Sequence, residues 1–105
     1  MSTIKLNSVH CERLQDSVTS DEIEVRIAGV KVGGPYGIHK RQTVQLGGIT
    51  RTFTGAVTVQ LVELDGNNTP DNLGQAVISD EPVTGVSRNF DAAEHAFYTL
   101  NYTVT

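Results

Sequence analysis

Hydrophobic and polar residues alternate along most of the chain, and a period of two places successive side chains on opposite faces of a β-strand. The pattern is clearest over Glu22–Val30, where Ile23, Val25 and Ile27 alternate with charged residues. One segment, residues 91–94, favours a helix, and it is long enough for a single turn at most. The alternation therefore predicts an all-β protein.

Eight segments carry this pattern, and residues typical of turns separate them. They are Thr3–Glu12, Glu22–Val30, Arg41–Leu46, Thr50–Thr54, Ala56–Leu64, Leu73–Ser79, Gly85–Phe90 and His95–Val104. The alternation in the first segment slips at Asn7 and Ser8, which predicts a β-bulge. The glycine-rich stretch Val32–Lys40 predicts a loop or an irregular edge. Many short strands joined by turns favour an eight-stranded antiparallel β-sandwich.

Composition agrees with this interpretation. Valine, isoleucine and threonine make up 31 of the 105 residues, and β-branched side chains favour strands. A chain of this length suits a single domain over residues 1–105. No apolar run exceeds three residues, whereas a membrane-spanning helix needs about 20. The N-terminus lacks the build of a secretory signal, so we expect a cytoplasmic protein, export without a leader, or a leader already removed.

Charge and cysteine content exclude several classes of function. The formal net charge is −4 at pH 7, which argues against nucleic acid as the main partner. The single cysteine, Cys11, excludes an internal disulfide and a multi-cysteine zinc site. Its neighbour His10 would face the other side of the strand. His39 and His95 are expected at opposite ends of the sandwich, so no nucleophile–base pair is predicted and the chain is expected not to be an enzyme.

The predicted connections gather acidic residues. If each turn reverses the chain, residues 13–21, 47–48, 65–72 and 91–94 share one end of the sandwich, and residues 32–40 and 80–84 share the other. The first end would hold Asp16, Asp21, Glu22, Glu63, Asp65, Asp71, Asp91 and Glu94, which are eight of the 12 acidic residues. Few basic residues are expected there, chiefly Arg13 and Arg51.

This end has the chemistry of a calcium site. Glu63 and Asp65 are two residues apart, so they would project from the face that also carries Leu61, and Asp71 follows a stretch that can fold it back. Clustered carboxylates repel one another, and Ca²⁺ prefers carboxylate, amide and carbonyl oxygens. Nearby amides could complete the shell; they are Asn67, Asn68 and Asn72. The alternative is that these residues only satisfy turn geometry.

Two segments resemble the calcium loops of the calcium- and phospholipid-binding C2 domains of synaptotagmin and protein kinase C. Thr19-Ser20-Asp21 before the strand Ile23–Ile27 resembles the family's first calcium loop, and Asp16 stands where that loop carries an earlier Asp. Val62-Glu63-Leu64-Asp65, five residues, and then Asp71-Asn72-Leu73-Gly74 resemble the third loop. The order of the segments implies the permuted C2 topology, in which the first calcium loop follows the first strand.

The resemblance also departs from the family pattern. Glu63 stands where the family has Asp, and the first loop is one residue shorter. The tip Gly66–Pro70 carries none of the apolar or basic residues that enter lipid in the family. The resemblance therefore implies calcium more strongly than it implies a membrane.

The sequence thus predicts a non-enzymatic calcium-binding module of C2-like fold, which would associate in a calcium-dependent way with a protein or membrane partner. The predicted ligands are Asp16, Asp21, Glu63, Asp65 and Asp71, and the additional candidates are Glu22, Asn67 and Asn72. The alternative is a structural subunit that assembles with copies of itself through its edge strands, with calcium optional.

Overall fold

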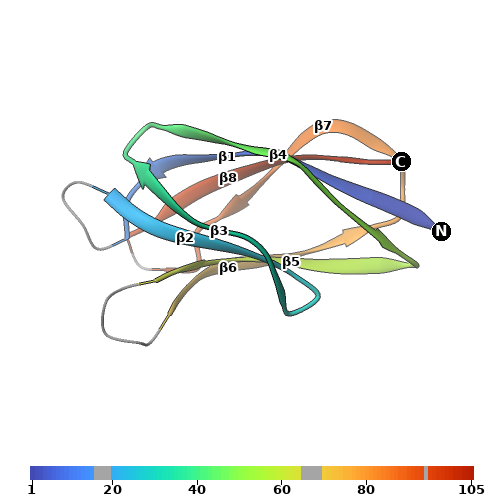
Figure 1. The fold of residues 1–105 in the computed structure, drawn as a ribbon, viewed down its shortest axis with the longest axis horizontal. Helices are drawn as coiled ribbons and strands as arrows, with labels where there is room; N and C mark the ends of the chain where they lie inside the picture. Colours follow the sequence, from blue (N-terminus) through green and yellow to red (C-terminus); the bar gives the residue numbers. More distant parts are fainter. Residues whose placement is uncertain (16–19, 65–69, 94) are drawn as a thin grey trace.

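The computed structural model is a sandwich of two antiparallel four-stranded sheets (Figure 1). It describes residues 1–15, 20–64, 70–93 and 95–105. The strands are β1 Ser2–Arg13, β2 Ser20–Ile27, β3 Val30–His39, β4 Thr43–Phe53, β5 Ala56–Glu63, β6 Asp71–Ser79, β7 Val83–Phe90 and β8 Phe97–Val104. One sheet has the order β4-β1-β8-β7 and the other the order β3-β2-β5-β6. The predicted eight-stranded antiparallel β-sandwich is therefore confirmed.

Alternation along the strands builds the core between the sheets. In β8 the buried positions are Tyr98, Leu100, Tyr102 and Val104, with partly exposed residues between them. The same period holds in β2, where the buried Ile23, Val25 and Ile27 face the other sheet. The predicted bulge in β1 is present, because the pairing with both neighbours shifts between Leu6 and Ser8. In the described ranges no helix is long and apolar enough to cross a membrane, and residues 91–93 form no helical turn.

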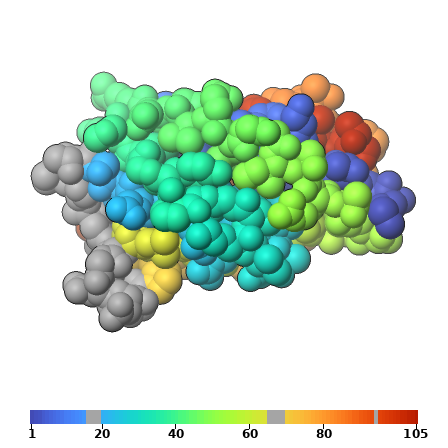
Figure 2. Space-filling model, in the orientation of Figure 1, coloured from blue at the N-terminus to red at the C-terminus, as the bar shows by residue number. Residues whose placement is uncertain are grey.

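Of the two alternatives for Val32–Lys40, the irregular edge is confirmed and the loop is wrong, because β3 occupies nearly all of the stretch, lies at the edge of its sheet and pairs with β2 through two register shifts. Its glycines allow an unusually close approach to β2. Gly34 has φ +100°, and a Cβ atom there would lie 2.6 Å from the carbonyl oxygen of Ile23. Only glycine fits such an approach, so the residue that suggested a loop instead permits pairing at a sheet edge. Figure 2 shows β3 and β4 covering much of the viewed face.

The two strands predicted over Arg41–Leu46 and Thr50–Thr54 are a single strand, β4. Gly47 and Gly48, expected as a turn, lie inside it with φ of +68° and +71°. They form an irregularity opposite the β1 bulge, where the pairing passes from Ser8↔Gln45 to Leu6↔Ile49. The strand count was right because one strand was missed and another was divided in two.

Because β3 is a strand and β4 is undivided, several residues lie at the opposite end of the sandwich from the one predicted. β1, β3, β5 and β7 end, and β2, β4, β6 and β8 begin, at one end of the sandwich, here called the acidic end (Figure 1). Gly47, Gly48 and Arg51 do not belong to the acidic end. The exposed Lys40 and Arg41 do. His39 also ends its strand there, so the prediction that His39 and His95 lie at opposite ends is wrong.

Candidate metal centre

The acidic end is built where β1 and β5 end and where β2 and β6 begin (Figure 1). Of the five predicted ligands, Asp21, Glu63 and Asp71 are described. Asp16 and Asp65 lie outside the described residues, as do the candidates Asn67 and Asn68. Among the ranges that the structure describes, no group of three His, Cys, Asp or Glu side chains is close enough to hold a metal ion. Support for a site therefore comes from the environments of individual side chains.

Asp21 is the most informative of these side chains. It lies on the core face of β2 opposite Ile38, and only 2% of its surface is exposed. Its Oδ2 accepts two hydrogen bonds, from the Tyr98 hydroxyl at 2.5 Å and from the backbone N–H of Gln15 at 2.8 Å. Its Oδ1 is also buried and has no hydrogen-bond partner among the described residues.

A buried carboxylate oxygen without a donor is costly, because it has lost the hydrogen bonds that water would make. No Lys, Arg or His of the described part of the chain forms an ion pair with Asp21. An ionised carboxylate oxygen can accept a hydrogen bond or bind a cation. Because Oδ1 of Asp21 has no hydrogen-bond donor among the described residues, its environment fits a bound cation.

Glu63 and Asp71 bring two more carboxylates to this end. They are direct partners in the pairing of β5 with β6, so their side chains leave the same face of the sheet. Glu63 is 4% exposed and pairs on its other side with Ile23, two residues along β2 from Asp21. Like charges directly opposite each other destabilise a strand pair, and a cation between them would reverse this effect.

Two buried groups of the core sit beneath Asp21. Cys11 is the cross-strand partner of Tyr98, so the two buried side chains lie side by side on the core face. Burial, followed by the hydrogen bond to Asp21, raises the pKa of the Tyr98 hydroxyl far above its usual range. Burial is also the main cause that raises the pKa of the Cys11 thiol above 9.0. Both groups therefore keep their protons at neutral pH, and Tyr98 remains a hydrogen-bond donor to Asp21.

Two additional candidates, Glu22 and Asn72, lie elsewhere on the sheet. Glu22 is exposed and alternates with Asp21, so it leaves the opposite face of β2. The Oδ1 of Asn72 accepts hydrogen bonds from Gln60 Nε2 at 3.0 Å and from Gly74 N at 3.1 Å. Asn72 pairs with Val62, the neighbour of Glu63 in β5, whereas Glu63 pairs with Asp71. The structure therefore does not bring these two side chains to Asp21.

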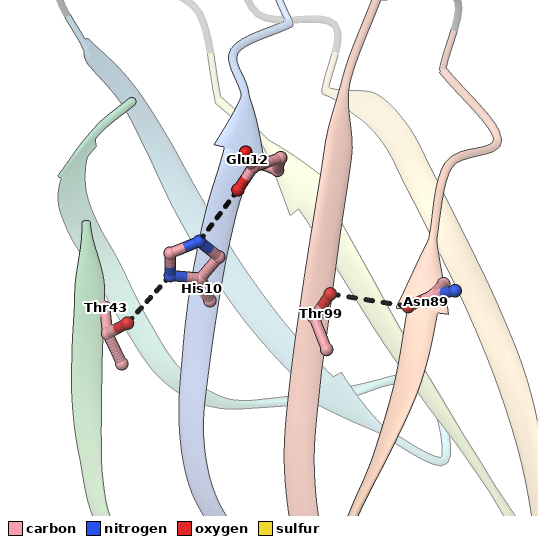
Figure 3. Close-up of polar contacts among 5 residues, drawn as sticks. All are labelled: His10, Glu12, Thr43, Asn89 and Thr99. Atoms are coloured by element: carbon pink, nitrogen blue, oxygen red, sulfur yellow. Dashed lines mark hydrogen bonds and ion pairs between the residues drawn. The ribbon is translucent and has the colours of Figure 1, made fainter. Parts of the chain in front are cut away.

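The outer face of the other sheet carries a separate polar group (Figure 3). His10 Nδ1 lies 2.8 Å from Thr43 Oγ1, and His10 Nε2 lies 3.1 Å from Glu12 Oε2. Thr99 donates a hydrogen bond to Asn89 on the same face. His10 thus points outward while its neighbour Cys11 is fully buried, which confirms that the two serve different faces.

Two residues of this region, Gln15 and Tyr98, were not among the predicted site residues. Tyr98 shares one face of β8 with Leu100 and Val104, a pattern typical of a core side chain, and no neighbouring residue indicates that its hydroxyl reaches another strand. Gln15 carries no charge, so it did not count among the acidic residues. Its one signal was its position beside Asp16. Its Oε1 is buried and has no hydrogen-bond partner among the described residues.

No protein-family model matches the chain, and no curated protein matches its sequence. Solved structures do match. One described as the structure of a C2 domain has a TM-score of 0.66 at 12% identity, and the match covers 100% of this chain and 99% of that one.

Two further matches contain C2 domains of extended synaptotagmins. A structure of two C2 domains of extended synaptotagmin 2 has a TM-score of 0.57 at 10% identity, over 98% of this chain and 39% of that chain. A C2 domain of a plant extended synaptotagmin 1 has a TM-score of 0.55 at 9% identity, over 98% and 90%. The chain therefore has the C2 fold, which confirms the resemblance inferred from its sequence. As the permuted topology requires, the first predicted calcium segment follows β1.

Proposed function

We propose that this chain is a non-enzymatic calcium-binding module, in which Asp21, Glu63 and Asp71 act together with Asp16 and Asp65 as carboxylate ligands. The observation that carries the proposal is the buried Oδ1 of Asp21, which has no donor among the described residues although it lies at the end where acidic residues gather. The C2 fold supports it by bringing β2, β5 and β6 together at that end.

The bound ion would supply positive charge to a cluster of carboxylates. Asp21 would bind through Oδ1, since Oδ2 is already occupied by Tyr98 and Gln15. Glu63 and Asp71 would contribute from the facing positions of β5 and β6. All of these groups are hard oxygen donors, which favours calcium over zinc or copper.

A partner with anionic groups suits the same end. The exposed Arg13 ends β1, and the exposed Lys40 and Arg41 join β3 to β4, so cationic side chains also lie at the acidic end. Calcium would neutralise the carboxylates and leave these cations facing an anionic protein or lipid surface. Co-sedimentation with vesicles of anionic or neutral lipid, each with calcium and with chelator, distinguishes a membrane partner from a protein partner.

The test of calcium binding is thermal unfolding with calcium and with chelator. At a hundredfold excess over Kd, binding to the folded state adds about 2.7 kcal/mol, which corresponds to a rise in Tm on the order of 10 °C. Asp65→Asn should abolish the rise, and Asp80→Asn, at the opposite end, should leave it intact. An identical Tm in calcium and in chelator would contradict the proposal.

A further inference from the structure

The two oxygens of Asp21 have different surroundings. Oδ2 receives both donors, the Tyr98 hydroxyl from β8 in the facing sheet and the backbone N–H of Gln15 from the segment after β1. Oδ1 receives none from the described residues. Two hydrogen bonds to one oxygen, from two different elements, fix both the position and the rotation of the carboxylate. The free orientation of the group is thereby lost, and Oδ1 is held in one direction.

Gln15 adds a second oxygen of the same kind. Its backbone N–H lies 2.8 Å from Asp21 Oδ2, so its side chain starts beside the carboxylate. Its Oε1 is buried and has no donor among the described residues, as is true of Asp21 Oδ1. Amide carbonyl oxygens are ordinary calcium ligands, and a neutral one adds coordination without adding charge repulsion.

We infer that Tyr98 and Gln15 are parts of the calcium site, in addition to the carboxylates. Tyr98 is a positioning residue that holds Asp21 by Oδ2 so that Oδ1 faces the ion. Gln15 is a further ligand through Oε1. This inference rests on the proposed calcium function, and it extends the site beyond acidic residues into the core of the facing sheet.

The test measures calcium affinity by calorimetry in the parent protein and in Tyr98→Phe, which removes only the hydroxyl. Loss of a group that orients a ligand lowers metal affinity by about 10- to 100-fold. The matched control is Tyr102→Phe, on the same face of the same strand and also buried, which should keep the parent affinity. A purely structural role would lower the Tm of Tyr98→Phe and leave the affinity unchanged.

Terbium luminescence gives an independent readout. The chain has three tyrosines and no tryptophan, so emission from bound Tb³⁺, excited through the protein, reports the nearest tyrosine. At saturating Tb³⁺, Tyr98→Phe should lose most of the emission and Tyr102→Phe should retain it. Tyr36 is directed elsewhere, because its hydroxyl lies against Gly33.

Gln15→Ala tests the second part without touching the core. It should lower calcium affinity about tenfold while the Tm in chelator stays within about 2 °C of the parent, since the residue is only half-buried. Parent affinity in both Tyr98→Phe and Gln15→Ala would overturn the inference and leave the calcium function standing. Absence of Ca²⁺ and Tb³⁺ binding in the parent protein would instead overturn the proposed function.

Discussion

Two buried carboxylates lie three residues apart on β2, and their surroundings differ. Glu24 is 7% exposed on the outer face, where Arg26 Nε lies 2.6 Å from its Oε2 and Lys31 Nζ lies 4.0 Å from its Oε1. Asp21 is 2% exposed on the core face, and its hydrogen-bond donors in the described chain are a neutral hydroxyl and a backbone amide.

Burial of a carboxylate is unfavourable unless charge or hydrogen bonds compensate for the lost water. The chain itself provides the compensating cations for Glu24. For Asp21 it provides donors to one oxygen and, within the described residues, none to the other. The comparison teaches that burial of an acid does not identify a metal site. The partners of the acid decide whether a cation is favoured, and Glu24, which has cations of its own, serves as the internal control for the ligand proposed at Asp21.

The largest expected effect is on the response to calcium. Asp21→Asn should abolish the calcium-dependent stabilisation of about 2.7 kcal/mol expected at a hundredfold excess over Kd, because the amide has lost the charge that binds the ion. Glu24→Gln removes the same charge from the same strand and should leave the response intact. Equal calcium responses in both variants, measured by thermal unfolding, would erase the distinction between the two carboxylates.

The next effect is on stability without calcium. Tyr98→Phe should lower the free energy of unfolding by about 2 kcal/mol, since Asp21 Oδ2 loses a donor that a buried charged group needs. Tyr102→Phe should cost less, because the described residues offer its hydroxyl no side-chain hydrogen bond to lose. Urea unfolding in chelator measures both. A cost for Tyr98→Phe no larger than that for Tyr102→Phe would show that the hydrogen bond to Asp21 contributes little.

A smaller effect is expected on stability at alkaline pH. It arises next to Asp21, because Tyr98 is hydrogen-bonded to Asp21 and Cys11 pairs with Tyr98. The pKa of the folded Cys11 thiol is raised above its usual 9.0. Its contribution to stability is therefore complete below pH 9 and is lost as the pH rises toward the folded value, because the unfolded chain ionises first.

The free energy of unfolding should consequently fall by about 1 kcal/mol between pH 8 and pH 10, in chelator. Cys11→Ala should reduce this slope, and Tyr98→Phe should reduce it further at the upper end of the range. Urea unfolding at a series of pH values measures the slope. A slope that Cys11→Ala leaves unchanged would assign the alkaline sensitivity to other groups.

The sequence was sufficient to predict the sandwich because alternation is strong wherever one strand face is buried. It identified the buried face of β2 and β8 and the bulge in β1 correctly. The predictions were wrong where glycines occur, because a glycine can either form a turn or allow a strand to continue through an irregularity, and the sequence does not distinguish the two. Gly34 permits β3 to pair closely with β2, and Gly47 and Gly48 allow β4 to continue through an irregularity instead of turning.

Those two errors also explain what was missed at the acidic end. Placing the β3 to β4 connection at the wrong end removed Lys40 and Arg41 from consideration and added Arg51. Asp21 was selected correctly as a residue of this end, but its partners come from β8 and from the segment after β1. Contacts between residues 77 apart in the chain depend on the packing of the two sheets, which no local pattern encodes.

The most direct test of the central claim is a calorimetric titration of the folded protein with calcium, which measures affinity and counts ions together. We predict saturable binding of at least one ion, with Asp21→Asn binding far more weakly and Glu24→Gln binding as the parent does. No binding at millimolar calcium by a protein that is demonstrably folded would contradict the account.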